Sequence, residues 1–117
     1  MKDKQYSRVC CLGDSLTEMG FWIYDVNAYL MSKGSKMRFY NCGIGGNKSC
    51  NAPYYLEDEV LRFNPDCVII MFGANDLADV YGKKFEHINQ QEKDEVLRRR
   101  TNFATNMRIL CLLLRQR

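Results

Sequence analysis

Histidine and proline are scarce in this 117-residue sequence, which has one histidine and two prolines, and it lacks long apolar runs. The apolar stretch behind the polar N-terminus, Val9 to Gly13, is far shorter than a signal-peptide core or a membrane span. One histidine cannot supply the ligands of a zinc site, and no cysteines form a Cys-x-x-Cys pair. We therefore expect a cytoplasmic protein without a structural metal.

The six cysteines do not suggest a disulfide framework either. Four of them lie in or at the end of strand-like apolar runs, where a free thiol behaves as a small buried hydrophobe: Cys10, Cys11, Cys42 and Cys67. The net charge of +3 is only mildly basic, and the one dense basic run, Arg98–Arg100, lies in a helix-like segment whose solvated face explains it. We expect neither a nucleic-acid nor a membrane partner.

Strand-like and helix-like segments alternate along the chain. We expect strands at 6–12, 36–41 and 67–72, helices at 20–32, 51–63 and 92–114, and a polar loop at 77–91. Strand-helix units of this kind pair in parallel through right-handed crossovers. The sequence therefore predicts a single α/β domain over residues 1–117, built on an open, doubly wound parallel sheet.

Each expected strand is followed by a distinctive loop. The three loops are Gly13-Asp14-Ser15, Gly43-Ile44-Gly45-Gly46 and Gly73-Ala74-Asn75-Asp76. The carboxyl ends of parallel strands meet at one edge of a sheet, which is where open α/β sheets bind ligands. These loops should therefore converge on one site.

The loops carry two of the three components that acyl transfer requires. Ser15 follows a strand and precedes a helix, so its hydroxyl can be exposed beside the backbone N–H groups of a helix N-terminus. The N–H of Gly46 and the side-chain amide of Asn75 are candidate donors to an oxyanion. Taken singly, each of these residues is better explained structurally, as an N-cap, a turn or an Asx-type loop. Their occurrence at three successive strand ends favours a site.

These loops do not match the motifs of dinucleotide-binding sites, P-loops or nucleophile elbows. Lys48 stands where a dinucleotide fingerprint needs its third glycine, and a P-loop would need a glycine before that lysine. Thr17 stands where a nucleophile elbow of the Gly-x-Ser-x-Gly type requires glycine. The sequence thus argues against an ordinary α/β-hydrolase.

The three blocks, Gly13-Asp14-Ser15-Leu16-Thr17-Glu18, Asn41-Cys42-Gly43-Ile44-Gly45-Gly46 and Gly73-Ala74-Asn75-Asp76, resemble in order and spacing those of the SGNH/GDSL hydrolases. The resemblance covers residues from about 6 to 114 and implies a flavodoxin-like three-layer α/β/α sandwich. It implies that Ser15 is the nucleophile, that Gly46 and Asn75 complete the oxyanion hole, and that no metal or organic cofactor is needed. Members of the family include esterases, lipases, thioesterases and carbohydrate acetyl-esterases.

Three further polar residues of these blocks are predicted to bind substrate: Asp14, Asn41 and Asp76. The predicted substrate is a small-molecule or carbohydrate-linked ester. Three aromatic residues, Trp22, Tyr54 and Tyr55, are candidates for an acyl or sugar pocket, although aromatic side chains at helical spacing usually pack in a core.

The fourth block of the family, an Asp-x-x-His that supplies the base and its orienting carboxylate, does not occur in these residues. The one histidine, His87, lies in the polar loop, either as a solvated side chain or as a substitute base oriented by Glu86 or Asp79. Loss of a triad member costs a factor of up to ~10⁶ in rate. We therefore expect the chain alone to be nearly inert.

Three readings follow from this missing block. In the first, the chain is an ester hydrolase that is either truncated at its C-terminus or completed by dimerisation or by a separate chain at the exposed edge of the third strand. In the second, it is an inactive remnant that serves as a binding module. A third reading, a phosphate-binding flavodoxin-like domain, depends on fold analogy alone.

Overall fold

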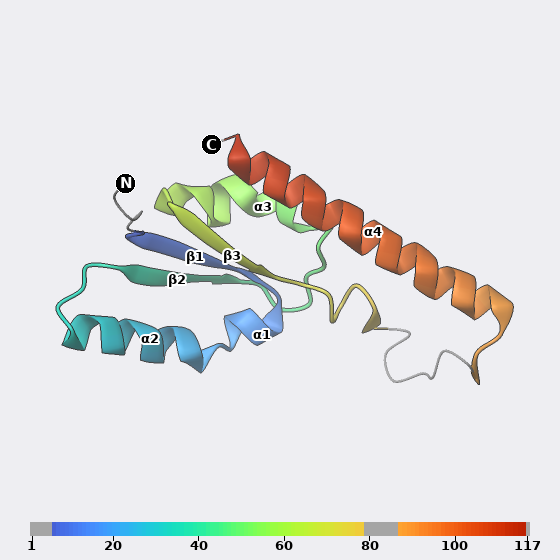
Figure 1. Ribbon diagram of the computed structural model, residues 1–117, viewed down its shortest axis with the longest axis horizontal. Helices are drawn as coiled ribbons and strands as arrows, with labels where there is room; N and C mark the ends of the chain where they lie inside the picture. Colours follow the sequence, from blue (N-terminus) through green and yellow to red (C-terminus); the bar gives the residue numbers. More distant parts are fainter. Residues whose placement is uncertain (1–5, 79–86, 117) are drawn as a thin grey trace, which may run out of the picture.

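A three-stranded parallel sheet forms the centre of the protein. The computed structural model describes residues 6–78 and 87–116. In these residues the sheet comprises β1 (Arg8–Gly13), β2 (Arg38–Gly43) and β3 (Cys67–Met71), in the order β2-β1-β3. β1 pairs in parallel with both neighbours (Figure 1). The α/β parallel sheet predicted from the sequence is confirmed.

Four α-helices and a short 3₁₀ turn accompany the strands in the described residues. They are α1 (Ser15–Glu18), α2 (Phe21–Ser32), α3 (Ala52–Glu59), the 3₁₀ turn η1 (Leu61–Phe63) and α4 (Gln90–Arg115). The predicted helices at 20–32 and 92–114 are confirmed within two residues. The predicted helix at 51–63 is divided into α3 and η1, and α1 was not predicted. Residues 79–86 of the predicted polar loop lie outside the described residues.

Local sequence signals explain where several elements begin and end. Pro53 occupies the first turn of α3, where its missing N–H costs no helical hydrogen bond. Gly34 follows α2 with a φ of 73°, which only glycine adopts readily. Asn64 ends η1 in the left-handed conformation with a φ of 50°, and asparagine tolerates this conformation better than most residues do.

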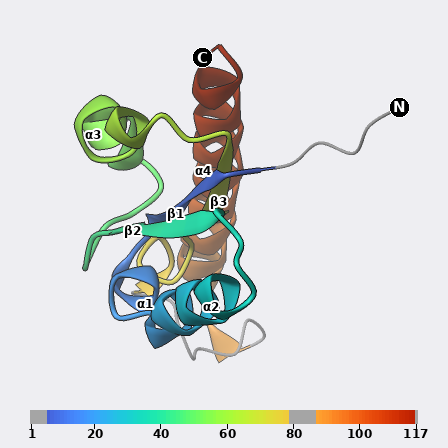
Figure 2. The same ribbon diagram turned by 90° about the vertical axis from the view of Figure 1, so that its left-hand side faces the viewer.

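Helices cover both faces of the sheet, but the main core lies on only one of them. α1 and α2 lie on one face, and α3 and α4 lie on the other (Figures 1 and 2). The main core lies under α3 and α4 and is formed by Cys10, Leu12, Cys42, Ala52, Leu56, Val60 and Leu110. The thiols of β1 are part of the interior, as expected, and burial raises the pKa of Cys11 to about 11. These cysteines therefore act as small apolar side chains.

The β3 side of the sheet is poorly covered. Ile69 and Met71 each remain 42% exposed, and β3 has no strand partner on its outer edge among the described residues. The radius of gyration is 17.0 Å, whereas a compact domain of this length has about 13 Å. The first half of α4 extends beyond the sheet (Figure 1). The exposed edge expected for the third strand is thus present.

No described helix is long and apolar enough to cross a membrane.

Candidate active site

Ser15 lies where β1 turns into α1, and it is half-buried. The preceding Asp14 is 2% exposed and caps the helix, because its carboxylate accepts the N–H of Leu16 at 3.0 Å. The Asp14 carbonyl accepts the N–H groups of Thr17 and Glu18. Asp14 therefore fixes the orientation of the serine loop, and its predicted contact with substrate remains a prediction.

Glycines at the strand ends let α1 pack against the sheet. A Cβ atom at Gly43 would lie 2.3 Å from the backbone nitrogen of Glu18, and one at Gly13 would lie 2.3 Å from the hydroxyl oxygen of Thr17 in the same helix. Neither distance is possible for a real side chain, so a larger residue would push α1 away. These two glycines thus position the helix that begins with Ser15.

The loop after β2 lies directly beside the serine. A Cβ atom at Gly45 would be 3.8 Å from the Ser15 Cβ. The backbone N–H of Gly45 donates to the Glu18 carboxylate, and the Asn41 side chain donates to the Glu18 carbonyl at 2.9 Å. Asn41 is therefore tied to α1 and holds the first two loops together.

The loops after β2 and β3 are also joined by hydrogen bonds. The Asn75 side-chain amide donates to the Asn47 carbonyl at 2.9 Å. The Asp76 carboxylate accepts the Ser49 hydroxyl at 2.6 Å and the Ser49 backbone N–H at 3.2 Å. Gly46, which precedes Asn47, is exposed and has a φ of 79°. The structure therefore brings the three loops to one rim of the sheet.

The predicted oxyanion donors have different surroundings. One hydrogen of the Asn75 amide is used by Asn47, and a primary amide carries a second hydrogen that can serve another acceptor. The positive φ of Gly46 orients its peptide in a way that residues with a Cβ rarely adopt. The roles of Ser15, Gly46 and Asn75 in an oxyanion hole remain predictions.

A base for Ser15 is not found among the described residues. The Ser15 hydroxyl has no hydrogen-bond partner there, and His87 is exposed just before α4. The two carboxylates expected to orient His87, Glu86 and Asp79, lie outside the described residues. Among the described residues, no general base therefore lies against Ser15, the predicted nucleophile.

Some contributors to the rim were missed in the sequence. Glu18 and Ser49 connect the loops, yet no spacing rule pairs Glu18 with Gly45 or Ser49 with Asp76, because these contacts join different strand ends. Of the aromatic candidates, Tyr55 packs against the core, and Tyr54 is 89% exposed. Trp22 makes an edge-to-face contact with Phe39.

Comparisons with known proteins agree with this architecture. The model of the GDSL-like lipase/acylhydrolase family matches residues 11–116. A search of curated proteins gave no match. An acetylxylan esterase from Geobacillus stearothermophilus is similar in structure, with a TM-score of 0.64 and 25% identity over 91% of this chain and 53% of that enzyme.

Two further solved structures are similar. One is an acetyl xylan esterase with a TM-score of 0.58 and 27% identity over 86% of this chain and 52% of that enzyme. The other is a gut microbial diltiazem-metabolizing enzyme with a TM-score of 0.71 and 24% identity over 92% of this chain and 24% of that enzyme. The chain thus spans about half or less of the length of these enzymes. The family match and the order of the three loops together show that this chain belongs to the GDSL-like lipase/acylhydrolase family.

Proposed function

We propose that this chain is the nucleophile-bearing part of a serine ester hydrolase, with Ser15 forming the acyl-enzyme. The observation that carries the proposal is the joining of three strand-end loops at one rim, where Ser15 adjoins Gly45 and Asn75 is bonded to the loop that contains Gly46. This arrangement offers a nucleophile and polarised N–H donors side by side.

In the proposed reaction the Ser15 oxygen attacks the ester carbonyl carbon while a base takes the hydroxyl proton. The carbonyl oxygen becomes an oxyanion, stabilised by the backbone N–H groups of Ser15 and Gly46 and by the Asn75 amide. The tetrahedral intermediate then expels the alcohol, which receives the proton from the base. Water attacks the acyl-serine in the same manner and releases the carboxylic acid.

We further propose that the base comes from polypeptide outside these 117 residues. Ile69, Met71 and the open edge of β3 form an incomplete face next to the site, and a further strand pairing there would cover it. A second copy of this chain offers the same open edge, and a separate complementing segment is the other possible source. Either would have to bring a histidine to the rim.

The proposed substrates are acyl or acetyl esters of small molecules or carbohydrates. Two structurally similar proteins are acetyl xylan esterases, and both exceed 24% identity over most of this chain. Their activity supports an ester substrate for the completed site.

A second candidate function is that of an inactive remnant that binds ligand without turnover. The specific observation in its favour is the exposed position of His87 and the lack of a partner for the Ser15 hydroxyl among the described residues. In this case Ser15 would remain an ordinary alcohol.

Labelling with a fluorophosphonate separates the two candidates, because the reagent phosphonylates an activated serine and releases fluoride. We expect mass spectrometry to find the adduct on Ser15, formed slowly without a base and faster with added imidazole, and none in Ser15→Ala. Replacing Asn75 with alanine should slow labelling by about 10²–10³-fold if the amide serves the oxyanion hole. Ser35→Ala, a change at a serine outside the rim, should label at the wild-type rate. An adduct on other serines only would refute the proposal.

A further inference from the structure

The loop after β2 makes a tight turn at the rim. The Asn47 N–H donates to the Ile44 carbonyl at 3.3 Å, so Gly45 and Gly46 are the central residues of this turn. Gly46, but not Gly45, has a positive φ, which is the pattern of a type II turn. The peptide that joins the two central residues is flipped between type I and type II turns. The type of turn therefore decides in which direction the Gly46 N–H points.

Hydrogen bonds from neighbouring loops hold this turn. At its end, the Asn47 carbonyl accepts the Asn75 amide at 2.9 Å. Within the turn, the Gly45 N–H donates to the Glu18 carboxylate. A hydrogen bond to a charged acceptor is roughly twice as strong as one between neutral groups. Because two consecutive glycines have wide conformational freedom, the bond to Glu18 restricts the part of the turn that needs it most.

Glu18 also connects the turn to the candidate nucleophile. Ser15 and Glu18 are three residues apart in α1, which places them on the same face of the helix. A Cβ atom at Gly45 would lie 2.9 Å from a Glu18 carboxylate oxygen and 3.8 Å from the Ser15 Cβ. The Glu18 carbonyl accepts the Asn41 amide at 2.9 Å, so α1 is joined both to β2 and to the loop that follows it. The turn that carries Gly46 is therefore held against the helix that begins with Ser15.

We propose that Glu18 is a positioning residue for the oxyanion hole: its carboxylate holds the Gly45 N–H and thereby directs the Gly46 N–H towards the ester carbonyl at Ser15. Without this bond the central peptide is freer to flip, and a flipped peptide presents its carbonyl in place of its N–H. No hydrogen bond joins the Glu18 carboxylate to the Ser15 hydroxyl in the described structure, so this role is separate from that of the base. The proposal rests on the proposed function, because the direction of the Gly46 N–H affects the reaction only if Ser15 is acylated.

The effect on the turn can be measured without any reaction, from the backbone amide resonances of the isotope-labelled 117-residue protein. Glu18→Ala removes the acceptor of the Gly45 N–H, and we expect the amide resonances of both Gly45 and Gly46 to shift. Glu18→Gln keeps an acceptor oxygen in the side chain and should leave the Gly46 resonance near its wild-type position.

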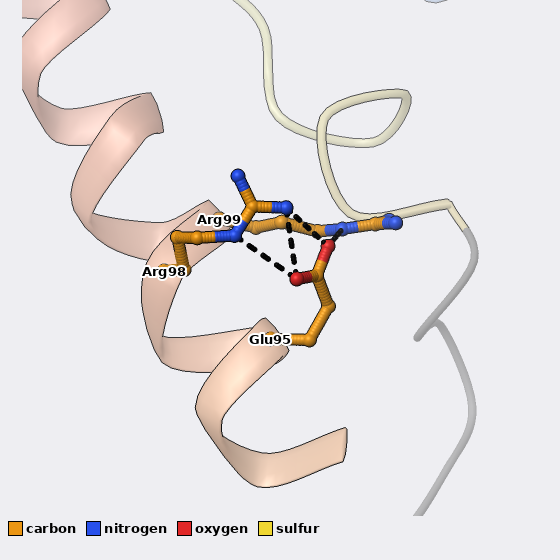
Figure 3. A network of polar contacts seen from close by, with 3 residues as sticks. All are labelled: Glu95, Arg98 and Arg99. Atoms are coloured by element: carbon orange, nitrogen blue, oxygen red, sulfur yellow. Dashed lines mark hydrogen bonds and ion pairs between the residues drawn. The ribbon is translucent and has the colours of Figure 1, made fainter. Parts of the chain in front are cut away.

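Glu95 on α4 provides a matched control. Its carboxylate also accepts N–H groups, from Arg98 at 2.6 Å and from Arg99 at 2.8 Å, but both of these partners belong to its own helix (Figure 3). Glu95→Ala therefore removes a hydrogen-bonded carboxylate without changing the bonds of the turn. We expect it to leave the resonances of the turn and the labelling of Ser15 unchanged.

Fluorophosphonate labelling of Ser15 in imidazole measures the effect on the reaction. Glu18→Ala should slow labelling by about 10–10²-fold, which is less than the loss of a whole oxyanion donor, and by the same factor at every imidazole concentration. Glu18→Gln should recover most of the rate. If Glu18 instead took the serine proton, Glu18→Ala would abolish only the labelling that needs no imidazole.

Three results would overturn the proposal. They are an unchanged Gly46 resonance in Glu18→Ala, equal slowing of labelling by Glu18→Ala and Glu18→Gln, and a loss confined to labelling without imidazole. The absence of any label on wild-type Ser15 would refute the proposed hydrolase instead. The Gly46 resonance would then still decide whether Glu18 holds the turn.

Discussion

At the scale of single residues, close packing at the strand ends places the candidate nucleophile. Gly13 and Gly43 end adjacent strands in register, and neither leaves room for a Cβ atom under α1. Asp14 then caps the helix. The position of Ser15 therefore depends on the packing of these two glycines and on the Asp14 cap.

Replacing Gly43 with alanine should displace α1, because the new methyl group would lie 2.3 Å from the Glu18 backbone nitrogen. We expect a loss of about 1–3 kcal/mol in the free energy of unfolding, as for other overpacked sites. Urea denaturation measures it. Gly34→Ala is the control: no atom lies within 4 Å of its added Cβ, and only the positive φ opposes it. Equal losses in the two variants would contradict the packing argument.

Asp66 should make stability depend on acid pH. Hydrogen bonds from the Ser7 backbone N–H, foremost, and from the Ser7 hydroxyl lower the pKa of this carboxyl below its usual range. Its stabilising effect is therefore complete above the unfolded-state pKa of about 3.9 and is lost as the pH falls through the lower folded-state pKa.

Asp66→Asn should accordingly lower the urea midpoint at pH 7 and have a smaller effect near pH 2. Asp58→Asn removes an exposed carboxylate from α3 and is the matched control. A difference between Asp66→Asn and wild type that grows on acidification would show the opposite sign and refute this account.

At the scale of elements, regular segments could be predicted and short ones could not. The continuous apolar run of β3 and the long pattern of α4 have strong local signals, and both were predicted within two residues. α1 is a single turn of four residues that depends on the Asp14 cap and on glycine contacts with β2. Contacts between distant segments decide its structure, so local pattern alone could not predict it.

The same distinction applies to the site. Ser15, Gly46 and Asn75 could be proposed because each follows a strand, and parallel strands end at one edge. The roles of Glu18 and Ser49 could not be predicted, because their hydrogen-bond partners become neighbours only when the strands pair.

The docking of α4 should depend on Leu110. This side chain is fully buried, whereas Leu112 is 52% exposed on the same helix. Leu110→Ala should cost about 2–5 kcal/mol in unfolding free energy, the range for a buried leucine. Leu112→Ala should cost much less, and urea denaturation compares the two. A larger effect of Leu112→Ala would mean that α4 docks by another face.

At the scale of the whole molecule, the protein resembles part of a larger hydrolase. β3 has an open edge in the described structure, and the match covers only 52% and 24% of the length of two similar enzymes. Exposed apolar groups on a sheet edge favour association with another chain. The proposed completion of the site would use this same edge.

Sedimentation should therefore detect concentration-dependent association of the purified 117-residue protein. Ile69→Lys places a charge on the uncovered side of β3 and should shift the protein towards monomer. Tyr54→Lys removes an apolar side chain that is more exposed, at 89%, but lies on α3, and it should leave association unchanged. A folded wild-type monomer at all concentrations would contradict this role of the edge.

The central claim is that Ser15 occupies a nucleophile's site and that the base comes from outside these residues. Fluorophosphonate labelling of Ser15 in increasing imidazole tests both parts, because imidazole can accept the serine proton. We predict slow labelling of Ser15 alone that accelerates with imidazole and is absent from Ser15→Ala. Labelling of the dilute, monomeric protein that is fast without imidazole would contradict the external base, and no labelling at any imidazole concentration would contradict the nucleophile.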